Sequence, residues 1–249
     1  MKSILSALVF SAAAVGAGGA ALAQEPAKNI VLVHGAFADE TSWDKVAQIL
    51  SAKGYKVTQV ANPLTSLADD VAATKAALDA QDGPTVLVAH SWGGVVIGEA
   101  GNDQKVKSLV YVSAFAPDKG ESLNKLLAGG APSEGVKAIR PNAEGGLIID
   151  PAQFPAVFAG DVPVAEAEAM AARQLPSNPA NFDAEAVVAA WHDKPNFYVV
   201  TANDLVLPPD AQRFFSGRIN ATVTEIAASH SGLVSHAEEV ASVIEAAAK

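Results

Sequence analysis

The sequence predicts a protein of the α/β class, with a mostly parallel sheet of about six strands and helices on both faces. From residue 29 onward, short apolar runs alternate with segments whose apolar residues recur at helical spacing. Strands that alternate with helices form parallel sheets, which are covered on both sides. The chain has 249 residues, of which 50% are hydrophobic, so it is long enough for one domain with a large core.

The first strand and helix are expected within residues 29–50. Residues 29–34 form a continuous apolar run that ends in His34, which is typical of a buried strand. The helix that follows is expected to begin at Thr41 or Ser42, since both are good N-caps, and to end at Leu50 before Gly54.

The next strand and helix are bounded by residues that end regular structure. A strand over residues 55–60 ends before Asn62-Pro63, and a helix is expected over residues 67–80. Asp69 and Asp70 stand in the first turn of this helix, where the helix dipole favours acidic side chains. Gly83-Pro84 separates the helix from the strand that comes next.

The remaining core elements follow the same logic. β-Branched and aromatic residues dominate the expected strands, and helical spacing marks the expected helices. Strands are predicted over residues 85–90, 106–115, 197–201 and 221–226, and helices over residues 95–100, 208–215 and 235–248.

Residues 117–195 depart from this rhythm, because Pro, Ala and Gly dominate them. Short helices are expected over residues 123–127, 165–175 and 184–191, with a single strand candidate over residues 147–149. We interpret the segment as a cap over the site and not as a second independent domain. The single domain of residues 24–249 is thereby divided into a core, residues 24–116 and 196–249, and a cap insertion, residues 117–195.

The N-terminal residues 1–23 are typical of a secretory signal peptide. Lys2 supplies a positive charge, an uncharged stretch follows, and Ala21-Leu22-Ala23 matches a small-x-small cleavage site. A transmembrane anchor is the alternative, but the second half of the stretch is only weakly apolar. The mature protein is therefore expected to begin at Gln24, to lack a stable membrane anchor, and to be exported to the periplasm or secreted.

Composition excludes several classes of function. The net charge is −10 and no basic cluster is present, which argues against nucleic acid as a partner. The absence of Cys excludes a Cys nucleophile and thiolate metal sites. The five His residues show no metal-binding spacing, so neither a metal site nor a cofactor is expected.

The segment around Ser91 has the pattern of a nucleophile elbow. A buried strand ends at this Ser and an apolar helix begins just after it, close to the motif G-x-S-x-G, with Ala89 in place of the first Gly. Small neighbours are needed because strand and helix nearly touch, and since Ala is still small we expect the turn to form. An ordinary strand-to-helix turn is the alternative interpretation.

These features resemble the α/β-hydrolase family, in particular its branch of small enzymes that includes methyl-ester esterases, pyrethroid-type carboxylesterases and hydroxynitrile lyases. The resemblance covers most of residues 29–249 and is weakest in the cap. It implies an α/β-hydrolase fold but leaves the substrate open. The matching segments are Val31-Leu32-Val33-His34-Gly35-Ala36-Phe37 with Trp43 downstream, Ala89 to Gly94, Val110 to Asp118, and Ser229-His230 with the helix after it.

The resemblance also implies a catalytic triad, because in this family the nucleophile, the acid and the His follow one another in that order. Asp204, just past the first strand after the cap, is the expected acid, and Asp118 is the alternative. His230 directly follows the last strand and is the expected base, with His236 as its rival. Ser91 would then be the nucleophile.

An oxyanion hole is implied in the same way. Its two donors are assigned to the backbone N–H groups of Trp92 and of Ala36 or Phe37, with Ala36 preferred. Gly35 lets the chain approach the substrate closely. His34 is expected to be a structural hydrogen-bonding residue and not a second base.

The resulting prediction is a serine hydrolase of small to medium, largely apolar carboxylic esters, acting through an acyl-enzyme intermediate on a small-molecule partner. Phe37, Phe154, Phe158 and Trp191 are expected to line the pocket, with ordinary core packing as the alternative for each. Two other classes stay open: a hydrolase of lactones, amides or C–C bonds with the same triad, and a non-catalytic ligand-binding protein of this fold.

Overall fold

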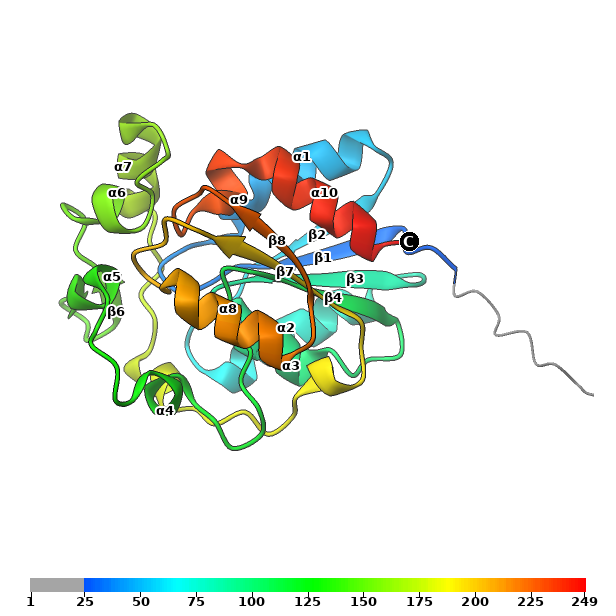
Figure 1. The fold of residues 1–249 in the computed structure, drawn as a ribbon, viewed down its shortest axis with the longest axis horizontal. Coiled ribbons are helices and arrows are strands. Elements are labelled where there is room, and N and C mark those ends of the chain that lie inside the picture. The colour runs from blue at the N-terminus through cyan, green and yellow to red at the C-terminus, as the bar shows by residue number, and fades with distance from the viewer. Residues whose placement is uncertain (1–24) are drawn as a thin grey trace, which may run out of the picture.

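A computed structural model describes residues 25–249, and the predicted signal peptide lies outside this range. The α/β class is confirmed: six parallel strands form one sheet in the order β2-β1-β3-β4-β7-β8 (Figure 1). The strands are β1 (Asn29–Val33), β2 (Lys56–Val60), β3 (Thr85–His90), β4 (Val106–Val112), β7 (Asn196–Thr201) and β8 (Thr222–Ile226).

Burial of the strands follows their place in the sheet. Every residue of β1, β3 and β4 is buried, which explains why apolar residues dominate these central strands in the sequence. The edge strand β8 exposes four of its five residues, and its Glu225 pairs with Arg213 on a neighbouring helix. Charge on an exposed edge discourages pairing with other chains.

Helices cover both faces of the sheet, and Figure 1 shows α1, α9 and α10 on one face and α2, α3 and α8 on the other. The helix expected from Thr41 or Ser42 starts later, since residues 40–43 form a 3₁₀ turn capped by Asp39. Among residues 25–249, no helix combines the length and apolar character needed to cross a membrane. The helices are α1 (Asp44–Ala52), α2 (Leu67–Asp79), α3 (Gly93–Ala100), α8 (Pro209–Arg218), α9 (Gly232–Ser235) and α10 (Ala237–Ala247).

Residues 117–195, here called the cap segment, connect β4 to β7. Figure 1 shows its helices α4 to α7 beyond the carboxyl ends of the strands, where ligands bind in open parallel sheets. The elements of the segment are α4 (Leu123–Leu127), α5 (Glu134–Lys137), β5 (Ile139–Pro141), β6 (Leu147–Ile149), α6 (Phe154–Val157), α7 (Val164–Ala172) and the 3₁₀ helices η2 (Pro179–Phe182) and η3 (Ala190–His192).

The helix expected over residues 184–191 is wrong. The N–H groups of Val187 and Val188 donate to the carboxylate of Glu99 on α3 instead of to carbonyls one turn back. Only the short η3 forms at the end of the segment. A tertiary acceptor has thus replaced the helical hydrogen bonds that the sequence favoured.

The cap segment is closed at its base, where it leaves and re-enters the core. The indole N–H of Trp191 donates to the carbonyl of Pro117 at 2.8 Å. Next to this contact, Gly120 N–H donates to Ala186 O at 2.7 Å, and Ala186 N–H donates to Glu121 O at 2.8 Å. These bonds join the two ends of a long insertion to each other.

Helix α3 packs against the strand ends so closely that one of its glycines has no room for a side chain. A Cβ at Gly94 would overlap the carbonyl oxygen of Phe115, whereas the nearest atom to a Cβ at Gly98, one turn later, is 4.0 Å away. Gly94 and Gly98 are therefore a crowded and an open position on one helix, at which the effect of an added methyl group can be compared.

We expect Gly94→Ala to lower the free energy of unfolding by at least about 2 kcal/mol, because backbone must move to relieve the overlap. Gly98→Ala should instead raise it by about 0.5–1 kcal/mol, because Ala favours the helix. Urea unfolding of the two variants and the wild type measures both effects. Equal midpoints for the two variants would contradict the close approach.

Candidate active site

Ser91 lies at the sharp turn between β3 and α3. Its φ of +52° falls in the left-handed region, which is unusual for a residue with a side chain. The turn is held from the neighbouring strand, since Ser91 N–H donates to Val112 O and Ser91 O accepts from Phe115 N–H, both at 3.2 Å. Ala89, in place of the usual Gly, is fully buried in β3, and the turn forms as expected.

The loop after β1 lies against Ser91. A Cβ at Gly35 would come within 2.7 Å of Ser91 Cβ, and a Cβ at Gly93 within 2.8 Å of Val33 O. Only glycine fits at such distances. The amides after Gly35 are therefore held beside the Ser91 side chain.

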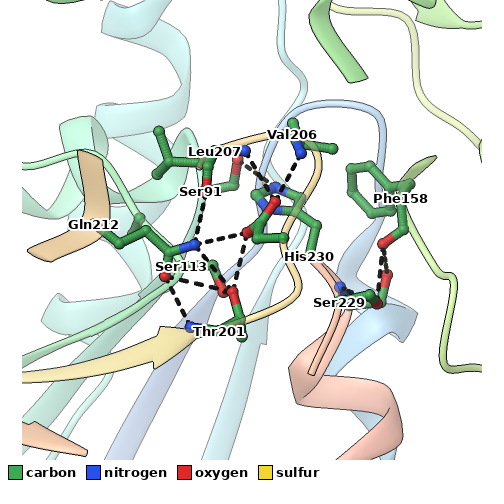
Figure 2. Close-up of polar contacts among 12 residues, drawn as sticks. Ser91, Ser113, Phe158, Thr201, Val206, Leu207, Gln212, Ser229 and His230 are labelled. Carbon is green, nitrogen blue, oxygen red and sulfur yellow. Dashed lines mark hydrogen bonds and ion pairs between the residues drawn. The ribbon is translucent and has the colours of Figure 1, made fainter. Parts of the chain in front are cut away.

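His230 connects Ser91 to Asp204. Its Nε2 lies 3.0 Å from Ser91 Oγ, and its Nδ1 lies 2.7 Å from Asp204 Oδ2 (Figure 2). Because the carboxylate accepts the Nδ1 proton, Nε2 is free to accept the proton of the Ser91 hydroxyl. The three side chains that the sequence separates by up to 139 residues thus form one hydrogen-bonded chain.

Asp204 is buried, and a buried carboxylate is stable only when its oxygens are hydrogen-bonded. Its Oδ1 accepts the N–H groups of Val206 and Leu207, at 2.8 and 2.9 Å. Its Oδ2 accepts from Thr201 Oγ1 at 3.0 Å and Gln212 Nε2 at 2.8 Å, in addition to His230 (Figure 2). Five donors therefore fix this carboxylate in place.

Gln212 was not among the residues singled out from the sequence. It is buried on the face of α8 that also carries Phe215, and the buried Ile219 follows at helical spacing just past the end of the helix. Its Oε1 accepts from Thr201 N–H at 2.9 Å, and its Nε2 donates to Leu207 O at 2.7 Å. A Gln within an apolar helix face was the available signal, since a buried amide needs partners.

His90, for which no specific role was predicted, lies beside His230. The two ring centroids are 4.6 Å apart, and His90 Nε2 donates to the main-chain carbonyl of His230 at 2.9 Å. Burial, together with the proximity of His230, holds the pKa of His90 well below its usual 6.5. A neutral ring therefore supports the loop that carries His230 without placing a second positive charge next to it.

His34 holds its own loop, in the way expected for a structural residue. Its Nδ1 donates to Gly35 O at 2.9 Å, and its Nε2 accepts from Asn62 N–H at 3.0 Å. Burial lowers the pKa of His34, which favours the neutral ring that this pattern requires.

Backbone amides line the space beside Ser91. Within residues 25–249, the N–H groups of Ala36, Phe37 and Trp92 donate to no protein acceptor. The indole of Trp92 is held separately, donating to the buried carboxylate of Asp70 at 2.8 Å. Amides in this position can donate to an oxyanion that forms next to Ser91.

Two of the four expected pocket residues, Phe154 and Phe158, form an aromatic pair next to His230, and a third, Phe37, pairs with Phe182. Phe37 and Phe154 border a void of about 10 Å³, no larger than one water molecule. Phe154 stacks on Phe158 at 4.6 Å, and the Phe158 ring meets the His230 ring edge-on at 4.8 Å. Ser91 itself is only 7% exposed.

Trp191 was wrongly expected in the pocket. Its carbonyl accepts from Asn196, the first residue of β7, so it lies at the amino ends of the strands, opposite the end that carries Ser91. Its ring stacks on His192 and faces Arg218. Its indole N–H donates to Pro117 O at the base of the cap segment. An aromatic residue within the cap suggested a pocket position, and the distant carbonyl that binds it could not be recognised from the sequence.

The two alternative residues for the triad lie elsewhere. Asp118 is paired with the exposed His192 and is not joined to His230. His236 contacts Ser235 and Asp161 at the surface. Among residues 25–249, no three His, Asp or Glu side chains are grouped so that they could hold a metal ion.

An apolar hollow lies next to the segment that holds Asp204. The hollow has a volume of about 440 Å³ and lies between α4 and α5 on one side and residues 206–208 on the other. The backbone N–H of Val206, one of its lining residues, donates to Asp204. Its apolar lining includes Leu126, Leu127, Val136, Val206, Pro208 and Ala211.

Comparison with known proteins places these features in a family. Residues 30–243 match the family model described as "Alpha/beta hydrolase family". The protein named Probable hydrolase R7 of Phoma sp. is 28% identical over 202 residues, 75% of this chain and 81% of that one. A carbendazim hydrolyzing esterase of Nocardioides sp. is 30% identical over 120 residues, 43% of this chain and 50% of that one.

A solved structure shares the fold over nearly its whole length. The crystal structure of a pyrethroid hydrolase from Sphingobium faniae superposes with a TM-score of 0.75 at 23% identity, covering 89% of this chain and 97% of that one.

We expect His90→Gln to make stability less dependent on pH. Since the pKa of His90 is depressed in the folded state, unfolding takes up a proton below about pH 6.5, and stability falls as the pH is lowered. Gln keeps a donor for the His230 carbonyl but cannot titrate. The slope of the unfolding free energy between pH 5 and 6.5 should decrease by up to about 1.4 kcal/mol per pH unit.

Urea unfolding across this pH range measures the slope. His90→Leu is the matched control: it should show the same change of slope, and in addition a loss of about 1–3 kcal/mol at every pH, because the His230 carbonyl loses its donor. A His90→Gln slope equal to that of the wild type would contradict the assignment.

Proposed function

Because the chain belongs to the alpha/beta hydrolase family, we propose that it is a serine esterase that cleaves small to medium, largely apolar carboxylic esters through an acyl-enzyme intermediate. The observation that carries the proposal is the hydrogen-bonded chain from Ser91 Oγ through His230 to Asp204, at 3.0 and 2.7 Å. Relatives named as esterases and hydrolases support the same reaction class.

In the first half of the proposed reaction, Ser91 Oγ attacks the ester carbonyl carbon while His230 Nε2 takes the hydroxyl proton. Asp204 holds the imidazole by its Nδ1–H and stabilises the positive charge that forms on it. His230 then returns the proton to the leaving alcohol oxygen as the C–O bond breaks, which leaves the acyl group on Ser91.

The second half repeats these steps with water. His230 takes a proton from a water molecule that attacks the acyl carbon, and gives it back to Ser91 Oγ as the acid leaves. In both halves the carbonyl oxygen becomes an oxyanion. The N–H groups of Trp92 and of Ala36, with Phe37 as the alternative, are proposed to donate to it.

The surroundings of His230 suit a ring that alternates between neutral and charged. His90 stays neutral at 4.6 Å, so the imidazolium meets no neighbouring cation. The Phe158 ring packs edge-on against His230, and the side chains of His230 and Asp204 are fully buried, so that water does not reach their contact. Attraction between the imidazolium and Asp204 is stronger in such a dry site than in water.

Apolar esters of modest size fit the apolar surfaces near the site. The rings of Phe154 and Phe158 lie next to His230, and the hollow of about 440 Å³ beside Val206 has room for a short alkyl or aryl group. The proposal also includes export, with the signal peptide of residues 1–23 removed before the protein acts in the periplasm or outside the cell.

We expect Ser91→Ala to lower kcat/KM for p-nitrophenyl butyrate by about 10⁴-fold or more, because no other group can form the acyl-enzyme. Wild type should also gain the mass of one fluorophosphonate group per chain, and Ser91→Ala should gain none. Ser242→Ala, on the exposed face of α10, is the control and should behave like the wild type. Equal rates for wild type and Ser91→Ala would rule out the proposed nucleophile.

We expect kcat/KM to be highest for p-nitrophenyl esters of two to eight carbons and to fall for the palmitate, because the space near the site is limited. Initial rates with acetate, butyrate, octanoate and palmitate, each below its solubility limit, measure the profile. A maximum at palmitate would contradict the proposed substrate size.

A further inference from the structure

The cap segment contacts both neighbours of His230 in the sequence. The carbonyl of Phe158 accepts from Ser231 Oγ at 3.0 Å and lies 3.3 Å from Ser229 Oγ (Figure 2). The Phe158 ring packs edge-on against the His230 ring. The loop that carries His230 is thus held from the cap side as well as by His90 from the core.

Asp161, three residues further along the cap segment, strengthens this contact. Its carboxylate accepts the N–H of Ser229 at 3.1 Å, the hydroxyl of Ser229 at 2.5 Å and the hydroxyl of Ser235 at 2.8 Å. His236 Nδ1 lies 3.5 Å away. One side chain of the cap therefore joins the start of the His230 loop to the end of α9.

The carboxylate is suited to this task because it is charged and its side chain is only 25% exposed, although the residue as a whole is exposed. Burial alone would raise the pKa of Asp161, but the hydrogen bonds from Ser229 and Ser235 outweigh burial and lower it. Hydrogen bonds to an ionised acceptor are about twice as strong as neutral ones. Asp161 can therefore hold the loop more firmly than a neutral side chain in its place.

We propose that Asp161 is a positioning residue for the esterase reaction: through Ser229 and Ser235 it sets the place of His230, so that the closed cap segment completes the catalytic geometry. The inference rests on the proposed function. The hydrogen bonds of Asp161 hold the loop on both sides of His230, at Ser229 and at Ser235. Loss of this hold would let the ring shift relative to Ser91 and weaken the activation of the hydroxyl.

A merely structural role for Asp161 would have a different signature. The cap segment has a second ionic contact with the core, Lys45 to Glu166 at 2.8 Å, which joins α1 to α7 and does not touch the His230 loop. Loss of that pair loosens the cap without changing the hold on His230. Glu166→Gln is therefore the matched control for Asp161→Asn.

The test compares kcat, KM and the rate constant of fluorophosphonate labelling of Ser91 in the wild type, Asp161→Asn and Glu166→Gln. Asn has the size of Asp but turns an amide donor toward the Ser donors. We expect Asp161→Asn to lower kcat and the labelling rate constant together by about 10- to 100-fold, since small misplacements of a catalytic group have effects of this size. KM should change by less than about threefold, and Glu166→Gln should leave all three within about twofold.

Ser235→Ala is a milder variant that removes one partner of Asp161, and it keeps the test valid if Asp161→Asn does not fold. It should lower kcat and the labelling rate constant together by about threefold to tenfold. A raised KM with unchanged kcat, or losses in Asp161→Asn equal to those in Glu166→Gln, would overturn the inference. A wild type that neither hydrolyses esters nor reacts with the fluorophosphonate would instead refute the proposed esterase.

Discussion

The left-handed backbone at Ser91 is the constraint on which the rest of the site depends. Such a conformation costs a residue with a side chain about 1–3 kcal/mol, and the hydrogen bonds of Ser91 to β4 offset it. The turn also needs three chain segments to approach closely, which explains the glycines at positions 35, 93 and 94. Because the backbone at Ser91 is fixed, the other catalytic residues must be positioned next to it by other strands. The ends of β7 and β8 bring Asp204 and His230 there.

Much of the core could be predicted from the sequence, because a strand covered on both faces must be apolar throughout. The central strands β1 and β3 and the turn at Ser91 are of this kind, whereas the edge strands β2 and β8 are recognised by their β-branched residues and by the turn residues around them. The cap segment was harder, since its structure depends on distant partners. Residues 184–189 do not form a helix because Glu99 accepts from the amides of Val187 and Val188. The strand β5 contains Arg140 and Pro141 and so lacks an apolar run.

The candidate site shows the same division. Ser91 and His230 stand in recognisable local patterns, and the structure brings them together with Asp204. The residues that hold them were not predicted. Gln212 gave a weak signal as an amide within an apolar helix face, and Asp161 gave none, because its partners lie about 70 residues away. Trp191 was misplaced because an aromatic residue in a cap suggests a pocket, whereas its indole N–H binds a carbonyl far from Ser91.

That same indole bond has a consequence for how such a protein can diversify. By joining Trp191 to Pro117, it makes the cap segment a loop that is closed at its root, and the entropy of closing a loop grows only slowly with its length. The interior of the insertion can therefore lengthen, shorten or be exchanged while the register of the six strands stays as it is. By the role proposed for Asp161, a replacement would have to retain a carboxylate where this residue meets the His230 loop. The part of the chain that can vary in length is in this way kept separate from the part that forms the sheet.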